Sequence, residues 1–357
     1  MIYSIKECFN IKDTITRLGL SQNSKLTYFS IYDSTIVEIL KKQGSLIPSE
    51  TTHFCTGVLD KTKIHGNGLY AGASSSGSVI GLELGLADVA ISTDTGGSTI
   101  VPGARMNYYA YKPTYGRISR YGLVPLCSKL DTVGVISKSF EGIKQTFKLL
   151  DFLDPKDLTS TPLIDRGLKE GLVLKISRNL FSEKDASRLK ELFPEAVFCD
   201  LDLNQREIMG AYWYELCPDF YSNMARFNGV HFKIPDAELI PHYKKDIISK
   251  LRSLELTKDV KSRIILGAFL LKNYDYNVIL KFKTKYHSRL SNDLWITPIA
   301  KGLYSNELTQ TPICALMNLL KRPAITLPLN LENGVLLSGP ANSDLNLFKL
   351  VENLKLF

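Results

Sequence analysis

Residues 72–99 read GASSSGSVIGLELGLADVAISTDTGGST and place one apolar segment between two polar, glycine-rich loops. The apolar part predicts a buried helix over Val79–Leu86, followed by a short buried strand over Val89–Ser92. The second glycine-rich loop, Asp94–Ser98, follows this strand directly. This order is typical of an α/β protein with a mostly parallel sheet, in which the chemistry sits at the carboxyl ends of strands.

The loop after the strand has the composition of an anion-binding turn. Glycine allows backbone N–H groups to approach a ligand closely. The consecutive N–H groups of Thr95, Gly96, Gly97 and Ser98 therefore predict a nest for a developing oxyanion, where one donor contributes on the order of 3 kcal/mol. Ser98, at the rim of this nest, is placed to attack a carbonyl carbon.

Two other motifs suggest different chemistry, but their surroundings do not suit it. His65–Ala71 contains a G-x-G-x-x-A pattern of the dinucleotide-binding type, yet Asp60 to Lys63 before it are polar rather than strand-like. Ser187–Lys190 has the pattern S-x-x-K within a charged helical stretch, so we expect its lysine to face water. The sequence has no G-x-S-x-G pattern, which argues against an α/β-hydrolase triad.

The remainder of the chain continues the α/β pattern. Its 357 residues are 44% hydrophobic and 22% charged, and no stretch reaches the roughly 18 apolar residues of a membrane span. We expect a single domain over residues 1–357, with a possible subdomain boundary near 154–172, where the chain turns polar. Further helices are predicted at Ser34–Gln43, Phe140–Phe152, Ala186–Phe193, Ile264–Leu271, Val278–Leu290 and within Met209–Phe227; further strands at Tyr3–Ile5, Leu172–Ile176, Leu294–Thr297 and Ala324–Leu327.

The net charge and the spacing of the cysteines and histidines exclude few classes of function. The net charge of +8 includes clusters at Lys244–Arg252 and Lys281–Arg289, which suit either solvated helix faces or an anionic partner such as tRNA. The six cysteines have no CxxC pair, and the five histidines lack ligand spacing. We therefore expect reduced, mostly structural cysteines and no metal.

The two serine motifs together resemble the amidase signature family. GASSSGS at 72–78 and DTGGSTIVP at 94–102 match that family's G-G-S-S-G-G-S and D-x-G-G-S-x-R-x-P, with the spacing between the serines kept. The resemblance implies that Ser98 is the nucleophile that forms an acyl ester. It also implies that Ser74, preceded by a cis peptide bond after Ala73, is a bridging serine.

The family's third catalytic member is a lysine in a V-K-D strand, which Ile5-Lys6-Glu7 matches here. A lysine has an ordinary pKa of about 10.4, and burial of such a side chain favours its neutral form, which is a base near pH 7. Lys6 would then take the proton of Ser74 while Ser74 takes that of Ser98. The implied fold is a central mixed, mostly parallel sheet covered by helices on both faces. The family's N-terminal helices do not precede Lys6 in this sequence.

Four longer blocks are similar to one branch of the family, the glutaminase (A) component of glutamyl-tRNA(Gln) amidotransferase of the fungal mitochondrial type. They are Lys112–Leu123, Ser128–Gly134, Tyr221–Val230 and Val260–Gly267. The resemblance implies glutamine hydrolysis and transfer of the ammonia to a B-type partner, the amidating subunit, which uses ATP and Mg²⁺ to amidate Glu-tRNA(Gln). It further implies a small third subunit in the complex, with a mitochondrial location, although the N-terminus has no clear presequence.

Several positions depart from the family pattern. Ile100 stands where the family has arginine, and Thr311 falls where an aspartate that holds the substrate α-amino group is expected; Glu307 lies nearby but out of register. Arg263 is a candidate anchor for the substrate carboxylate, with a structural salt bridge as the alternative. Two other functions therefore stay open: a stand-alone amidase acting on another small amide, and a catalytically weak scaffold subunit.

Overall fold

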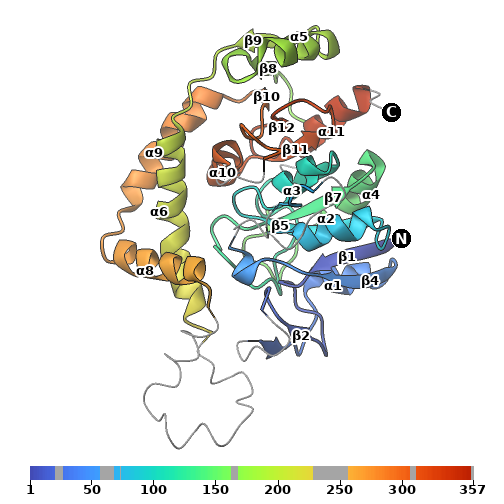
Figure 1. The fold of residues 1–357 in the computed structure, drawn as a ribbon, viewed down its shortest axis with the longest axis vertical. Helices are drawn as coiled ribbons and strands as arrows, with labels where there is room; N and C mark the ends of the chain where they lie inside the picture. The colour runs from blue at the N-terminus through green and yellow to red at the C-terminus, as the bar shows by residue number, and fades with distance from the viewer. Residues whose placement is uncertain are drawn as a thin grey trace, which may run out of the picture.

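The structure is a computed structural model that describes residues 1–20, 27–56, 68–72, 74–161, 168–227, 256–305 and 311–354. Its centre is a ten-stranded sheet (Figure 1). In sheet order the strands are β4 (Ser45–Ser49), β1 (Ile2–Lys6), β5 (Val89–Asp94), β7 (Thr132–Ser137), β6 (Tyr109–Lys112), β11 (Ala324–Leu327), β12 (Val335–Ser338), β10 (Leu294–Thr297), β8 (Leu174–Ser177) and β9 (Val197–Cys199). A separate pair joins β2 (Ile15–Thr16) to β3 (Tyr28–Phe29).

The sheet is mixed, with its parallel pairs at the two ends. Strands β4, β1 and β5 run parallel at one end, and β10, β8 and β9 run parallel at the other. The strands between them pair antiparallel. The predicted central mixed sheet with surrounding helices is confirmed, and it runs through the described chain on both sides of residues 154–172.

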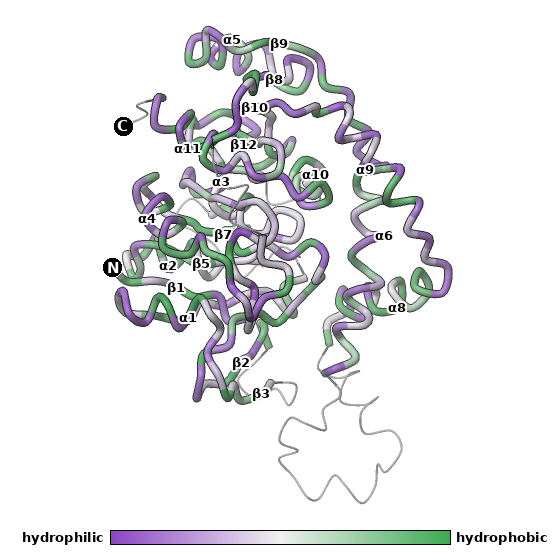
Figure 2. The backbone as a smooth tube through the Cα atoms, turned by 180° about the vertical axis from the view of Figure 1, so that it is seen from behind, coloured by the Kyte–Doolittle hydropathy of each residue, from purple (hydrophilic) through white to green (hydrophobic). Residues whose placement is uncertain are grey.

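Helices pack around this sheet and also form an arm beside it. The shorter ones are α1 (Thr35–Leu40), α2 (Ser76–Glu83), α3 (Ile100–Arg105), α4 (Phe140–Leu150), α5 (Glu183–Leu192), α10 (Pro312–Leu319) and α11 (Asp344–Asn353), with single turns η1 (His53–Cys55) and η3 (Arg178–Leu180). The arm consists of α6 (Gln205–Met224), α8 (Lys258–Lys272) and α9 (Tyr276–Leu290), which lie together along one side of the sheet in Figures 1 and 2.

The helix that follows the first serine motif begins earlier than its apolar residues predict. It spans Ser76–Glu83 rather than Val79–Leu86, and its end leaves Leu84 and Leu86 exposed. Gly85 has a φ of 70°, a left-handed conformation that glycine adopts easily and that ends a helix. The polar residues before Val79 therefore belong to the first turn of the helix rather than to the loop.

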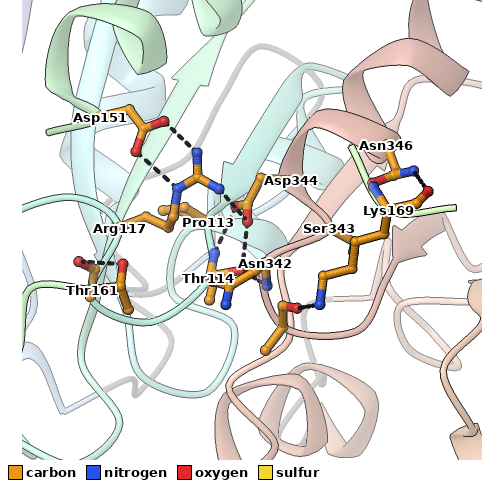
Figure 3. Close-up of polar contacts among 12 residues, drawn as sticks. Pro113, Thr114, Arg117, Asp151, Thr161, Lys169, Asn342, Ser343, Asp344 and Asn346 are labelled. Atoms are coloured by element: carbon orange, nitrogen blue, oxygen red, sulfur yellow. Dashed lines mark hydrogen bonds and ion pairs between the residues drawn. The ribbon is translucent and has the colours of Figure 1, made fainter. Parts of the chain in front are cut away.

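A buried cluster of polar side chains fixes α11 against the segment that follows β6 (Figure 3). Asp344, the first residue of α11, accepts hydrogen bonds from Thr114 N at 2.8 Å and Thr114 Oγ1 at 2.6 Å. Arg117 Nη1 lies 3.3 Å from the same carboxylate, and its guanidinium also pairs with Asp151. The sequence block Lys112–Leu123 therefore anchors α11 through Thr114 and Arg117.

Candidate active site

Lys6 and Ser74 are the first pair of predicted residues that the fold brings together. Lys6 ends β1, is fully buried, and its Nζ lies 2.6 Å from Ser74 Oγ. The same Nζ lies 3.0 Å from the hydroxyls of Ser75 and Thr93. Thr93 belongs to β5, the parallel neighbour of β1, so both side chains reach the same carboxyl edge of the sheet.

Ser74 is held through its backbone as well as its side chain. Its carbonyl accepts hydrogen bonds from Thr51 Oγ1 at 2.8 Å and from Thr52 N at 3.3 Å. The residue is fully buried and lies two positions before the first residue of α2. Ala73 lies outside the described residues, so the predicted cis peptide bond before Ser74 does too.

Asp94 organises the glycine-rich loop from the end of β5. One carboxylate oxygen accepts hydrogen bonds from Gly97 N at 2.9 Å and Asn318 Nδ2 at 2.6 Å. The other accepts from Thr99 N at 2.8 Å and Ile100 N at 3.2 Å. The buried carboxylate of Asp94 therefore holds the loop in a closed turn and accepts hydrogen bonds from the N–H groups at the start of α3. Sequence reasoning assigned no role to Asp94 or Asn318, although the aspartate lies inside the quoted motif.

Ser98 lies on this loop with a partly exposed side chain. Within the described residues, its hydroxyl makes no hydrogen bond, and the backbone N–H groups of Gly96 and Ser98 also have no acceptor there. The N–H of Gly97 is occupied by Asp94. Of the predicted nest, the donors at Gly96 and Ser98 are therefore available to a substrate oxygen, and the donor at Gly97 is not.

The Thr95 side chain points away from any substrate and into the protein. Its Oγ1 donates to Asp131 Oδ1 at 2.7 Å. Asp131 also accepts from the backbone N–H groups of Leu126 and Cys127, at 2.8 Å and 3.0 Å. Burial raises the pKa of the Asp131 carboxyl to about 7, against the lowering effect of the hydrogen bond from Thr95. Through Asp131, the block Ser128–Gly134 thus holds the side chain of Thr95 at the start of the loop.

Tyr212 and Thr311 both lie against the glycine-rich loop at Gly96. A methyl group placed on Gly96 would lie 2.6 Å from the hydroxyl oxygen of Tyr212, which belongs to α6. Thr311, directly before α10, donates from Oγ1 to Gly96 O at 2.8 Å. Thr311 therefore lies beside the nucleophile loop, where the family resemblance places a substrate-binding acid. Tyr212 was missed because nothing in its sequence surroundings distinguishes it from a helix core residue.

Arg263 lies on α8, on the side that faces α6. Its Nη1 donates to Thr56 O, and the guanidinium carbon lies 5.0 Å from the centre of the Trp213 ring. Burial lowers the pKa of this guanidinium. Arg263 forms no ion pair with a described residue, so the salt-bridge alternative has no counterpart there. Its role as a carboxylate anchor stays a prediction, and Glu307 lies outside the described residues.

Of the two competing motifs, the structure describes Ser187–Lys190 in full and only the end of His65–Ala71. His65, Gly66 and Asn67 lie outside the described residues, and the lysine of the S-x-x-K pattern, Lys190, is exposed on α5 as expected. No group of three acidic, histidine or cysteine side chains in the described ranges is arranged to hold a metal ion. All six cysteines are free. Across those same ranges, no helix combines the length and apolarity needed to cross a membrane.

In the basic cluster that the structure describes, two side chains form ion pairs with acidic residues. In the cluster at 281–289, Lys285 pairs with Glu207 at 2.7 Å and Arg289 with Asp202 at 2.7 Å. These pairs favour the solvated-face interpretation over an anionic partner. The cluster at 244–252 lies outside the described residues.

Comparison with known proteins points to one family. The family model described as Amidase matches residues 1–295 of this chain. An A-type subunit of glutamyl-tRNA(Gln) amidotransferase from Staphylococcus aureus (strain Mu3) is 27% identical over 383 residues, covering 91% of this chain and 76% of the relative. A mitochondrial A-type subunit of the same enzyme, from Eremothecium gossypii, is 29% identical over 303 residues, covering 73% and 63%. A solved amidase structure superposes with a TM-score of 0.75 at 18% identity, covering 99% and 84%.

Proposed function

This chain belongs to the amidase family, and on that premise we propose that it is the glutamine-hydrolysing, A-type subunit of a glutamyl-tRNA(Gln) amidotransferase. The observation that carries the catalytic part is the buried contact of 2.6 Å between Lys6 Nζ and Ser74 Oγ, next to the loop that presents Ser98. The names of the relatives from Staphylococcus aureus and Eremothecium gossypii support the choice of reaction.

The first half-reaction forms an ester on Ser98. Ser98 Oγ attacks the side-chain amide carbon of glutamine while Ser74 takes its proton and Lys6 takes the proton of Ser74. The N–H groups of Gly96 and Ser98 donate to the resulting oxyanion. The C–N bond then breaks, the relay returns the proton to nitrogen, and ammonia leaves. The second half-reaction repeats these steps with water as the nucleophile and releases glutamate.

The surroundings of Lys6 suit this relay. Its Nζ contacts three hydroxyl groups, and it forms no ion pair with a residue in the described ranges. A single hydroxyl, that of Ser74, makes the shortest of these contacts. Hydrogen bonds around a catalytic group are often long or absent without substrate, so the free Ser98 hydroxyl is compatible with a transfer to Ser74 when an amide binds.

The proposed complex would supply the amidation step through other subunits. The amidating subunit would bind ATP and Mg²⁺, activate the glutamyl group of Glu-tRNA(Gln), and receive the ammonia; a small third subunit would complete the assembly. The similarity to the Eremothecium gossypii protein supports mitochondrial translation as the setting. Arg263 would hold the glutamine carboxylate through its remaining N–H groups.

A stand-alone amidase for another amide is the second candidate, and Thr311 favours it. The Thr311 hydroxyl is engaged with Gly96 O, and a hydroxyl offers no charge to a substrate ammonium group. A substrate without an α-amino group would avoid that loss. The two candidates share the same Lys6, Ser74 and Ser98 chemistry and differ in the amide and the partner.

The test is glutamine-dependent formation of Gln-tRNA by the chain co-expressed with its cognate amidating subunit, with Ser98→Ala beside it. We expect Ser98→Ala to lose ammonia release and ester formation while the complex still assembles. Ser187→Ala, an exposed serine on α5, is the matched control and should keep full activity. Unchanged activity in Ser98→Ala would reject the nucleophile; release of ammonia only from other amides, without the amidating subunit, would favour the second candidate.

A further inference from the structure

The outer side of α8 carries large apolar side chains that the described part of the chain leaves largely uncovered. Ile265 is 70% exposed and Phe269 is 65% exposed. With Lys258, Ser262 and Lys272 they follow a spacing of four, three, four and three residues, which places all five on one face of the helix. We call these five residues the α8 stripe. Exposed apolar side chains grouped in this way mark interaction surfaces more often than scattered ones do.

The described part of the fold packs against the other side of α8 and leaves the stripe exposed. The opposite side packs on α6, where a methyl group on Gly267 would lie 2.1 Å from Cys217 O, and Val260 is buried. The close crossing at Gly267 fixes α8 against α6 and turns the stripe outward. Figures 1 and 2 show α8 at the end of the arm formed with α6 and α9, beside the sheet rather than between other elements.

Charge at both ends of the stripe indicates what fits it. Lys258 and Lys272 are exposed and form no ion pair with any residue in the described ranges. Asp259 is the exposed acid next to Lys258 in sequence, on the neighbouring side of the helix. An apolar centre between two free cations complements a segment with apolar residues in its middle and acidic residues near its ends. The net charge of +8 for the whole chain has the same sign.

We propose that the α8 stripe is the docking surface for an amphipathic, acidic helix of a partner subunit in the amidotransferase complex. The alternating spacing of four and three matches the seam between two packed helices. A membrane-bound helix presents a broad, continuous apolar sector, whereas this stripe has polar Ser262 within it and a lysine at each end. The inference rests on the proposed function, because it takes the partner from that complex.

The docking surface is also connected to the candidate active site. Arg263 lies on the inner side of the same helix and contacts Thr56 and the Trp213 ring. Trp213 packs edge-on against Tyr212, the ring that covers Gly96. A helix bound along α8 therefore restrains Arg263 directly and Tyr212 through the contacts of α8 with α6.

The test measures assembly with the purified cognate amidating and third subunits, through affinity titration and co-purification. Ile265→Asp with Phe269→Asp should weaken assembly at least about tenfold, as hot-spot losses do. Lys258→Glu with Lys272→Glu should weaken it and reduce its dependence on salt. The matched control is Ile31→Asp with Leu84→Asp, two apolar residues that are 77% and 67% exposed elsewhere on the surface, and it should assemble normally.

The outcomes separate this inference from the proposed function. If the unaltered chain assembles and the Ile265/Phe269 variant assembles equally well, the stripe is not the docking surface. The inference then fails while the proposed function stands. If the unaltered chain does not assemble but hydrolyses amides, the proposed function fails first. Binding of the unaltered chain to vesicles of anionic phospholipid, or its self-dimerisation, would also overturn the inference if the stripe variant lost it and the control kept it. Glutaminase activity of the isolated variant, measured in parallel, reports whether it is folded.

Discussion

Gly96→Ala is the substitution whose effect the structure specifies most closely. The added methyl would lie 2.6 Å from Tyr212 Oη and 2.7 Å from Tyr212 Cζ. Carbon atoms in good contact are about 3.5–4.0 Å apart, so the overlap is about 1 Å. Tyr212 is buried and packs against Trp213, with ring centres 5.1 Å apart, so the ring cannot swing aside freely. The loop that carries Ser98 must absorb part of the displacement.

The expected cost follows from that overlap. Overpacking in a buried site destabilises by about 1–3 kcal/mol. A displacement of a reacting group by about 1 Å lowers the rate on the order of 100-fold. We therefore expect kcat for ammonia release to fall between about tenfold and 100-fold in Gly96→Ala, with a smaller change in the thermal midpoint than a core cavity would cause.

A double-mutant cycle tests the reasoning. In a Tyr212→Ala background the methyl has room, so Gly96→Ala should lower kcat there by less than about threefold. Gly97→Ala is the matched comparison: Gly97 has a φ of 119° and its methyl would meet Cys314 and Thr311 instead, so Tyr212→Ala should not rescue it. Normal kcat in Gly96→Ala, or equal losses in both backgrounds, would refute the contact with Tyr212 as the cause.

Three further outcomes follow from the site. Lys6→Ala should lower the rate of ester formation by about 10²–10⁴-fold with an unchanged near-UV circular dichroism spectrum, because it removes the final proton acceptor; near-normal activity would exclude the relay. Because burial raises the pKa of Asp131 to about 7, from an ordinary value of 3.8, the folded state holds a proton that the unfolded state releases between these values. The free energy of unfolding, relative to that of Asp131→Asn, should therefore fall by up to about 1.4 kcal/mol per pH unit from pH 4 to 7 and stay level above pH 7. Urea titrations at each pH would measure it. Parallel curves of unfolding free energy against pH for the two proteins would contradict the assignment. Asn318→Leu removes the donor to Asp94 and should cost about 1–3 kcal/mol in urea unfolding and lower kcat more than it raises KM, whereas an effect on KM alone would argue against a role in shaping the loop.

The sequence already located the residues that meet at the carboxyl edge of β1 and β5. Lys6 and Ser74 were predicted as partners and lie in contact, and the second glycine-rich loop follows a fully buried strand as expected. Periodicity also located most of the described helices, although the helix predicted from Ile264 begins at Lys258, and α3, α10 and α11 were not predicted. It placed α2 three residues late because polar residues in a first helical turn resemble a loop.

What periodicity did not reveal was how distant segments support the loop. Asn318 and Asp94 are 224 residues apart, and Thr311 and Gly96 are 215 apart, so no local pattern relates them. The antiparallel centre of the sheet was equally invisible, because strands such as β6 and β12 are short and fully buried and their residues give no sign of their direction.

The sequence by itself determined the family of this protein: two serines at a fixed spacing and a strand lysine match the amidase pattern, and the family model matches residues 1–295. The reason is that residue type and local spacing survive in the linear order of the chain. Only the tertiary structure decided which N–H groups of the loop have no acceptor in the described ranges, that Asp94 takes the donor of Gly97, and that Tyr212 and Thr311 lie against Gly96. Those properties depend on distances of about 3 Å between segments that meet only when the sheet and the arm are assembled.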